Sequence, residues 1–245
     1  MFWEDVDNHI TVISPMEKKR YITYNERIIN RLEELGFKRK KRDFFIRNLS
    51  EDVRQEITFG HSTQGRAHVK YYAIRAVIIL PKVLTLVKDL DIYIPRTAFY
   101  SSNIGELMPP PRPNYLEWLI GEDTDEKYDN KVVDSMLYHI EKYALPFLDK
   151  YSSPAAIIEG IRNCAYSCRY GDDDHALIAL LLYGTAKDFL WFVEQRSYEK
   201  QFQEYDHEGH WDFKHPKEPI NRACREFLEC AEKLKPLFKE KGIVW

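Results

Sequence analysis

Three histidines lie close together near the C-terminal end of the chain, His207, His210 and His215, and Asp212 lies among them. Imidazole and carboxylate groups are suitable zinc ligands, and three protein ligands plus a water molecule would form a catalytic site. The spacing matches no metal motif, because His-Glu-Gly-His is one residue short of the metalloprotease pattern, in which a helical turn separates the two histidines. We therefore assign no metal ligand and expect no cofactor, and a metal-dependent hydrolase using this segment is an alternative function.

A run of basic residues is the second candidate: Lys38, Arg39, Lys40, Lys41 and Arg42. Clustered cations bind phosphates by releasing counterions, and neighbouring aromatic side chains could stack on bases. A solvated sheet edge explains the same residues, because lysine in particular discourages edge-to-edge pairing of sheets. The chain has 36 Lys and Arg against 39 Asp and Glu, so its net charge of -3 gives no overall attraction for nucleic acid. We favour the solvated edge and keep nucleic-acid binding through residues 38–47 as a second alternative.

Aromatic side chains are plentiful, with 16 Tyr, 13 Phe and 5 Trp. Most must be buried, but tyrosine and tryptophan also serve as anchors on recognition surfaces. Tyr100, Arg112 and Tyr115 flank or lie within a proline-rich stretch at 109–113, which makes them the candidates for contact with a partner. A stiff connection between two strands is the alternative interpretation of this stretch.

Two further groups have plainer explanations. The aspartates at 172–174, followed by His175, suit the start of a helix, where negative charge and capping oxygens are favourable. Four cysteines are too few for a disulfide scaffold, and Cys164–Cys168 and Cys224–Cys230 lack the two-residue gap of redox or zinc motifs. We expect all four thiols to be reduced and none to be catalytic.

The elements that hold these residues begin with a helix. Ser14 and Glu17 form a capping box with Pro15 in the first turn, and apolar residues then recur every three or four positions. Gly36 followed by Phe37 predicts that the helix ends at a glycine in the left-handed conformation. Phe37 is then expected to fold back and make a hydrophobic contact with the helix.

Strand-like segments follow at 38–48, 53–61, 67–80, 96–102 and 115–120, and a helical pattern runs from 126 to 145, where Pro146 should end or kink it. These patterns predict an α+β fold. We expect an antiparallel meander of about four or five strands, covered on one face by the first helix and the 126–145 helix.

Beyond residue 150 the pattern is helical throughout. We expect two domains, an α+β domain at 1–150 and a helical region at 151–245 docked on it. The acidic N-terminus does not resemble a signal peptide, and no apolar run reaches the length of about 20 residues that spans a membrane. We therefore expect a soluble, cytoplasmic protein without a membrane partner.

The segment Leu35-Gly36-Phe37-Lys38-Arg39-Lys40, followed by Arg42-Asp43-Phe44-Phe45-Ile46-Arg47 and by a strand carrying Ile57 and Phe59, resembles the opening of the bacterial family called domain of unknown function 4304. The resemblance covers roughly residues 15–150. It implies no catalytic residue, and it implies a bacterial protein, some relatives of which neighbour toxin and immunity loci.

No group of residues has the spacing of a known catalytic site. We therefore expect a non-catalytic protein-binding module of immunity or accessory type, whose partner is another protein or a second copy of itself in a homodimer. Nucleic acid is not the partner that we expect.

Overall fold

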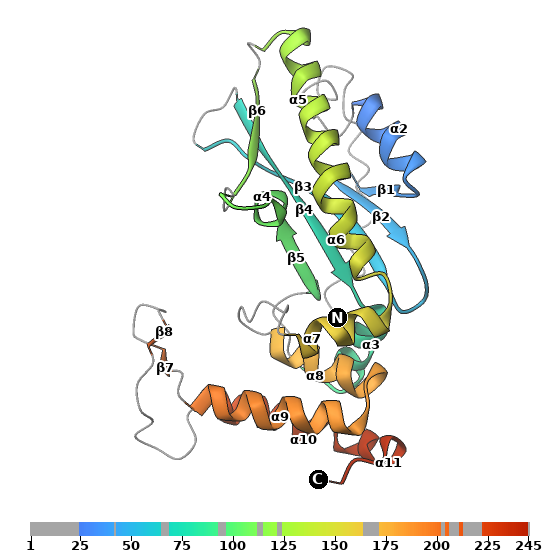
Figure 1. Ribbon diagram of the computed structural model, residues 1–245, viewed down its shortest axis with the longest axis vertical. Helices are drawn as coiled ribbons and strands as arrows, with labels where there is room; N and C mark the ends of the chain where they lie inside the picture. The colour runs from blue at the N-terminus through green and yellow to red at the C-terminus, as the bar shows by residue number, and fades with distance from the viewer. Residues whose placement is uncertain are drawn as a thin grey trace. The chain divides into compact units, whose positions relative to one another are not determined.

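The computed structural model describes residues 25–41, 43–64, 69–92, 97–111, 115–121, 124–163, 172–201, 204–205, 211–212 and 222–244 (Figure 1). The strands are β1 (Lys38–Lys41), β2 (Phe44–Asn48), β3 (Arg54–Ser62), β4 (Val69–Ile79), β5 (Tyr100–Asn103), β6 (Glu117–Gly121), β7 (Glu204–Tyr205) and β8 (Trp211–Asp212). The α-helices are α2 (Glu26–Glu34), α3 (Pro81–Asp89), α4 (Ile104–Leu107), α5 (Glu126–His139), α6 (Leu145–Lys150), α7 (Pro154–Arg162), α8 (Asp172–Tyr183), α9 (Ala186–Gln201), α10 (Arg222–Lys233) and α11 (Phe238–Lys241). A π-helix η2 (Ile140–Ala144) and a 3-10 helix η3 (Lys235–Leu237) complete the described elements.

The predicted α+β fold is confirmed: β1 to β6 form one antiparallel sheet, in the order β1-β2-β3-β4-β5. The central strand β4 also pairs with β6, from Val69 opposite Gly121 to Ala73 opposite Glu117. Residues 76–79 at the end of β4 are apolar and buried on both faces, which is typical of a central strand.

The single strand expected at 38–48 is two strands. β1 and β2 form a hairpin whose connection lies at residues 42–43, so the sheet has six strands rather than four or five. Lys41 lies opposite Phe44, and the pairing shifts register between Arg39 and Lys41. The continuous hydrophilic run gave no turn signal, because neither glycine nor proline marks this bend.

The chain divides into two compact units, and each consists of several segments. Unit 1 comprises Met1–Arg47, Ile57–Arg75 and Asn103–Leu145, and unit 2 comprises Asn48–Glu56, Ala76–Ser102 and Pro146–Trp245. Strands β2, β3, β4 and β5 therefore contribute residues to both units. The expected division at about residue 150 stays a prediction.

In unit 1, helices α2 and α5 contact each other and lie on one face of the sheet (Figure 1). Ile28 and Leu32 are the buried residues of α2. Arg27 on α2 forms an ion pair with Asp134 on α5. These contacts account for the covering layer that the alternating strand pattern requires.

Helix α2 begins and ends at identifiable signals. Asn25 has extended backbone angles, and its side chain accepts a hydrogen bond from the Arg27 amide, so α2 begins at Glu26. The predicted capping residues Ser14, Pro15 and Glu17 lie outside the described residues. The predicted stop is confirmed: Gly36 has a φ of +84°, and the amide of buried Phe37 donates to the Leu32 carbonyl over 2.9 Å.

Pro146 does not end the long helix, because α6 continues through it; the predicted kink stays a prediction. The π-helix η2 precedes it, and the Leu145 amide donates to the Ile140 carbonyl, five residues back. Pro146 then occupies the second position of α6. A proline removes one helical hydrogen bond, and the change of hydrogen-bond pattern occurs in the turn before it.

Unit 2 is built around α8, which contacts α3, α7, α9 and α10. Its residues 176–180 are completely buried, as expected of a helix that is apolar on all sides. The C-terminal region is helical, as expected, apart from the short antiparallel pair β7–β8. No helix of the described residues is both long and apolar enough to cross a membrane.

Candidate binding surface

The histidines of the predicted metal segment, His207, His210 and His215, lie outside the described residues. Asp212 lies in strand β8, and its side chain is outside the description. Within the described ranges, no three His, Cys, Asp or Glu side chains gather as metal ligands would. The metal-dependent alternative therefore stays a prediction, and metal analysis of unsupplemented full-length protein would decide it.

The three predicted partner-binding residues do not form one surface. Tyr100 is only 7% exposed, and its ring packs at 4.5 Å from that of Tyr151 and at 4.8 Å from that of Phe99 in the core of unit 2. Burial raises the pKa of the Tyr100 hydroxyl. Arg112 lies outside the described residues. Tyr115 is 52% exposed, so of the three it alone has a described side chain that a partner could contact.

Tyr115 is positioned by a buried neighbour. The side-chain oxygen of Asn103 accepts hydrogen bonds from the Gly105 amide over 2.8 Å and from the Leu116 amide over 3.0 Å. The backbone amide of Asn103 in turn donates a hydrogen bond to the Glu106 side chain over 3.0 Å, which completes a capping box at the start of α4. Asn103 thus fixes the two ends of the segment between β5 and β6, and Tyr115 lies next to the second end.

Beneath the surface, a hydrogen bond between two side chains connects strand β6 to helix α5. The indole Nε1 of buried Trp118 donates to Ser135 Oγ over 3.0 Å. The Nδ1 atom of His139 lies 2.7 Å from the Ser135 carbonyl oxygen. Because a carbonyl oxygen only accepts hydrogen bonds, Nδ1 is the donor in this contact and carries a proton.

His139 is the centre of an aromatic cluster, which we define as Trp118, Tyr138, His139, Lys142 and Tyr143. Its ring centroid lies 5.5 Å from Trp118, 5.2 Å from Tyr138 and 5.8 Å from Tyr143. Tyr138 is 52% exposed, and Lys142 is exposed as well. The cluster therefore extends from the core of unit 1 to its surface.

Lys142 is held in place within this cluster. Its ammonium group donates a hydrogen bond to the Tyr138 hydroxyl, which raises the pKa of Lys142. The same ammonium lies 4.9 Å from the centre of the Tyr138 ring and 5.5 Å from that of Tyr143. The cluster thus presents a positive charge close to two aromatic rings.

Two residues of the cluster, Lys142 and Tyr143, lie in the π-helix that follows α5. Residues Ile140–Ala144 form the π-helix η2, a rare conformation that occurs frequently at functional sites. Helix α4 contacts η2, and strand β6 contacts α5. Tyr115 lies two residues before β6, which carries Trp118 of the aromatic cluster.

No residue of this cluster is among the candidates that the sequence predicted. The available signal was the spacing: Tyr138–Lys142 and His139–Tyr143 are both four residues apart, which places each pair on one helix face.

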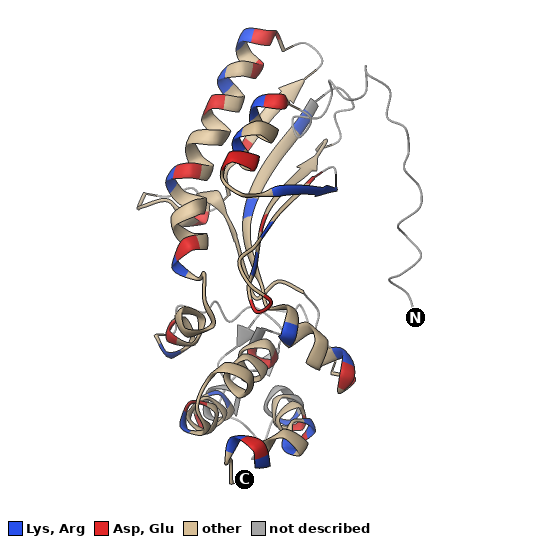
Figure 2. Ribbon diagram, turned by 90° about the vertical axis from the view of Figure 1, so that its right-hand side faces the viewer, with Lys and Arg blue, Asp and Glu red and all other residues tan. Residues whose placement is uncertain are grey.

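The basic run lies on β1, the edge strand of the sheet (Figure 2). Lys38, Lys40 and Lys41 are exposed and Arg39 is partly buried, whereas Arg42 is outside the described residues. These positions agree with the predicted sheet edge.

At the start of α8, the acidic residues are part of the packing of unit 2. Arg196 on α9 forms an ion pair with Asp173 over 2.9 Å. His175 is 1% exposed, and neither ring nitrogen has a hydrogen-bond partner among the residues that the structure describes. Burial lowers the pKa of His175 to about 4, so the ring is neutral near pH 7.

One described cysteine, Cys230, is buried with a free thiol, and burial raises its pKa. A thiol that is protonated near neutral pH is a poor nucleophile. The expectation that no cysteine is catalytic stays a prediction for all four.

No family model matches the chain, and no similar protein was found among curated proteins or among solved structures. The resemblance to the domain of unknown function 4304 family stays a prediction.

Proposed function

We propose that the protein is a non-catalytic protein-binding module and that its contact surface is formed by Tyr115 and the aromatic cluster. The observation that carries this proposal is the exposed pair of Tyr138 and Lys142 on a helix that is anchored through Trp118 and Ser135. The resemblance described above extends the proposal to a bacterial, cytoplasmic protein of immunity or accessory type.

The chemistry of the surface suits a protein partner. Tyrosine offers a large rigid ring with a polar end, and such residues dominate the binding energy of many interfaces. Lys142 is already held by Tyr138, so binding costs less side-chain entropy than it would for a free lysine. Tyr138 replaces the buried Tyr100 of the original prediction, and Tyr115 is retained.

The serine and histidine of the surface do not favour catalysis. Ser135 Oγ lies 3.5 Å from Nδ1 of His139, the nitrogen that already carries a proton for the backbone carbonyl. A general base must accept the proton of the serine hydroxyl through an unprotonated nitrogen. Ser135 and His139 therefore serve to position the aromatic rings.

The test is affinity capture from the native host with the full-length chain as bait. We expect a partner protein to be recovered by the wild type and lost with Tyr115→Ala/Tyr138→Ala, because loss of one anchoring tyrosine costs about 2 kcal/mol, or about 30-fold in affinity. The matched control is Tyr128→Ala, which removes an exposed tyrosine of α5 that lies outside the cluster.

Self-association is measured in parallel by sedimentation of the wild type and the same variants. A dimer that dissociates on Tyr115→Ala/Tyr138→Ala would identify the partner as a second copy. The proposal fails if the wild type recovers no protein, stays monomeric and turns over phosphoester or peptide substrates.

A further inference from the structure

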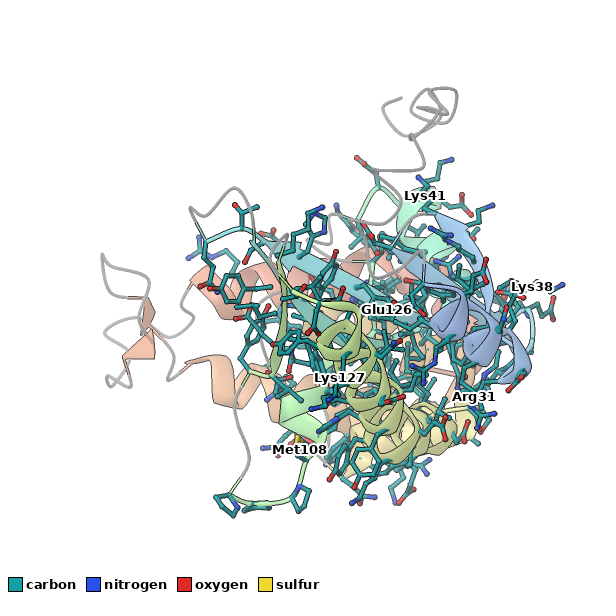
Figure 3. All side chains as sticks on the ribbon, turned by 90° about the horizontal axis from the view of Figure 1, so that it is seen from above. Arg31, Lys38, Lys41, Met108, Glu126 and Lys127 are labelled. Carbon is teal, nitrogen blue, oxygen red and sulfur yellow. The ribbon has the colours of Figure 1, made fainter. Side chains whose placement is uncertain are left out.

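Strand β1 carries an uninterrupted row of positive charge. All four of its residues are basic, and Lys38, Lys40 and Lys41 are exposed. The strand stands out in Figure 2 as a basic element along its whole length. In Figure 3, Lys38 and Lys41 extend outward from the ribbon, away from the side on which Met108 lies.

Arg31 of unit 1 has a structural role that Lys38 and Lys40 do not share among the described residues. Arg31 binds Glu141 over 2.7 Å and Glu34 over 2.8 Å, and it lowers the pKa of Glu141. In contrast, Lys38 and Lys40 make no ion pair with any of the described residues. Their ammonium groups are thus available to an external anion.

An exposed aromatic ring lies beside these charges. Phe44 is 42% exposed and is paired with Lys41 in the β1–β2 hairpin. The next residue, Phe45, is completely buried, and its ring packs edge-on at 5.8 Å from that of Phe59. The hairpin core is therefore filled by Phe45, and Phe44 keeps an open face at the basic edge.

We propose that β1 and Phe44 form a binding site for single-stranded nucleic acid. Lysines that contact phosphates release condensed counterions, which supplies sequence-independent affinity. An exposed aromatic ring next to the cations gives one base a stacking platform. This site goes beyond the proposed function and shares no residue with the aromatic cluster.

The exposed ring distinguishes this ligand from other polyanions. An acidic peptide would pair with the lysines but would not need Phe44, and a duplex keeps its bases stacked on one another. A second copy of the chain is disfavoured at this edge, because antiparallel pairing of two β1 strands would place like charges opposite each other.

The test is fluorescence anisotropy of the full-length chain with labelled dT20 and rU20 oligonucleotides. Three phosphate contacts predict that the affinity falls about 20-fold between 50 and 200 mM salt. Lys38→Gln/Lys40→Gln/Lys41→Gln should abolish binding and Phe44→Ala should weaken it at least fivefold, with the salt dependence unchanged for Phe44→Ala. The side chains changed are exposed, and circular dichroism checks that the fold is retained.

The matched control is Lys88→Gln/Lys127→Gln/Lys131→Gln, which removes the same charge from exposed helical positions and should leave binding unchanged. Three outcomes overturn the proposal: no binding of either oligonucleotide up to about 100 μM protein, equal loss in the control variant, or an unaltered affinity of Phe44→Ala. A glutamate 20-mer that binds as tightly as dT20 would overturn it in favour of an acidic protein partner.

Discussion

The neutral imidazole ring of His175 is buried in α8, and its effect on the stability of the folded protein depends on pH. The folded protein binds a proton at this ring only near pH 4, whereas the unfolded chain binds it near pH 6.5. The stabilisation of the folded protein by neutral His175 is fully present above pH 6.5. It is lost progressively as the pH falls from 6.5 to 4. The loss of this stabilisation lowers the free energy of unfolding by roughly 3 kcal/mol over that range.

Replacement by His175→Phe tests this prediction. Because neither ring nitrogen makes a hydrogen bond with a described residue, we expect the variant to be at least as stable as the wild type at pH 7. Urea unfolding at pH 7, 6 and 5 should show a smaller acid-dependent loss for the variant. Parallel curves for the two proteins would show that another group causes the loss.

Gly160 is required by two tyrosines. A Cβ atom at this position of α7 would lie 2.7 Å from the Tyr100 hydroxyl and 2.8 Å from a ring carbon of Tyr151, and both rings are buried. We expect Gly160→Ala to destabilise the protein by about 1 kcal/mol, because overpacking outweighs the better helix propensity of alanine.

The measurement for Gly160→Ala is the midpoint of urea unfolding. Gly60→Ala is the control, since its Cβ atom would meet its nearest neighbour only at 3.8 Å. Equal effects of the two substitutions would contradict the steric explanation.

At the level of elements, Asn103 couples α4 to the start of β6. Asn103→Ala removes the acceptor of two amides, those of Gly105 and Leu116, and should cost about 2 kcal/mol. Asn103→Asp keeps the acceptor, and the side-chain nitrogen that it removes has no partner in the described part of the chain, so it should retain most of the stability.

Hydrogen exchange provides the local readout for the Asn103 variants. We expect the Leu116 amide to exchange faster in Asn103→Ala than in Asn103→Asp, because only the alanine variant lacks the acceptor. If both variants exchange equally, Asn103 does not hold the segment that carries Tyr115.

The sequence predicted elements best where a local signal decides them. Gly36 ended a helix as expected, and β4 was recognised from its apolar second half. The hairpin within 38–48 was missed because its turn contains neither glycine nor proline, and the passage of the helix through Pro146 depends on a π-helix that no residue pattern indicated.

At the scale of the whole molecule, the fold class was predictable and the binding surface was largely not. The alternation of apolar and polar residues and the helical periodicity are local properties of the sequence, and they predicted the α+β fold correctly. Exposure depends on distant contacts: Tyr100 was predicted to be on the surface, but Tyr151 and Gly160 enclose it. Tyr138 was not selected because its contacts with His139 and Lys142 form only in the folded helix.

The interleaving of the two units has a consequence for synthesis on the ribosome. All segments of unit 1 have been translated once Leu145 is made, whereas residues 48–56 and 76–102 belong to unit 2 and must await the chain beyond Pro146. Gln55, for example, donates its buried hydrogen bond to the Leu148 carbonyl, and Phe99 packs beside His175. At 5–20 residues per second, the last hundred residues take about 5–20 s to appear. During that interval the apolar second half of β4 has already emerged without its own unit, which makes the nascent chain a natural client of chaperones.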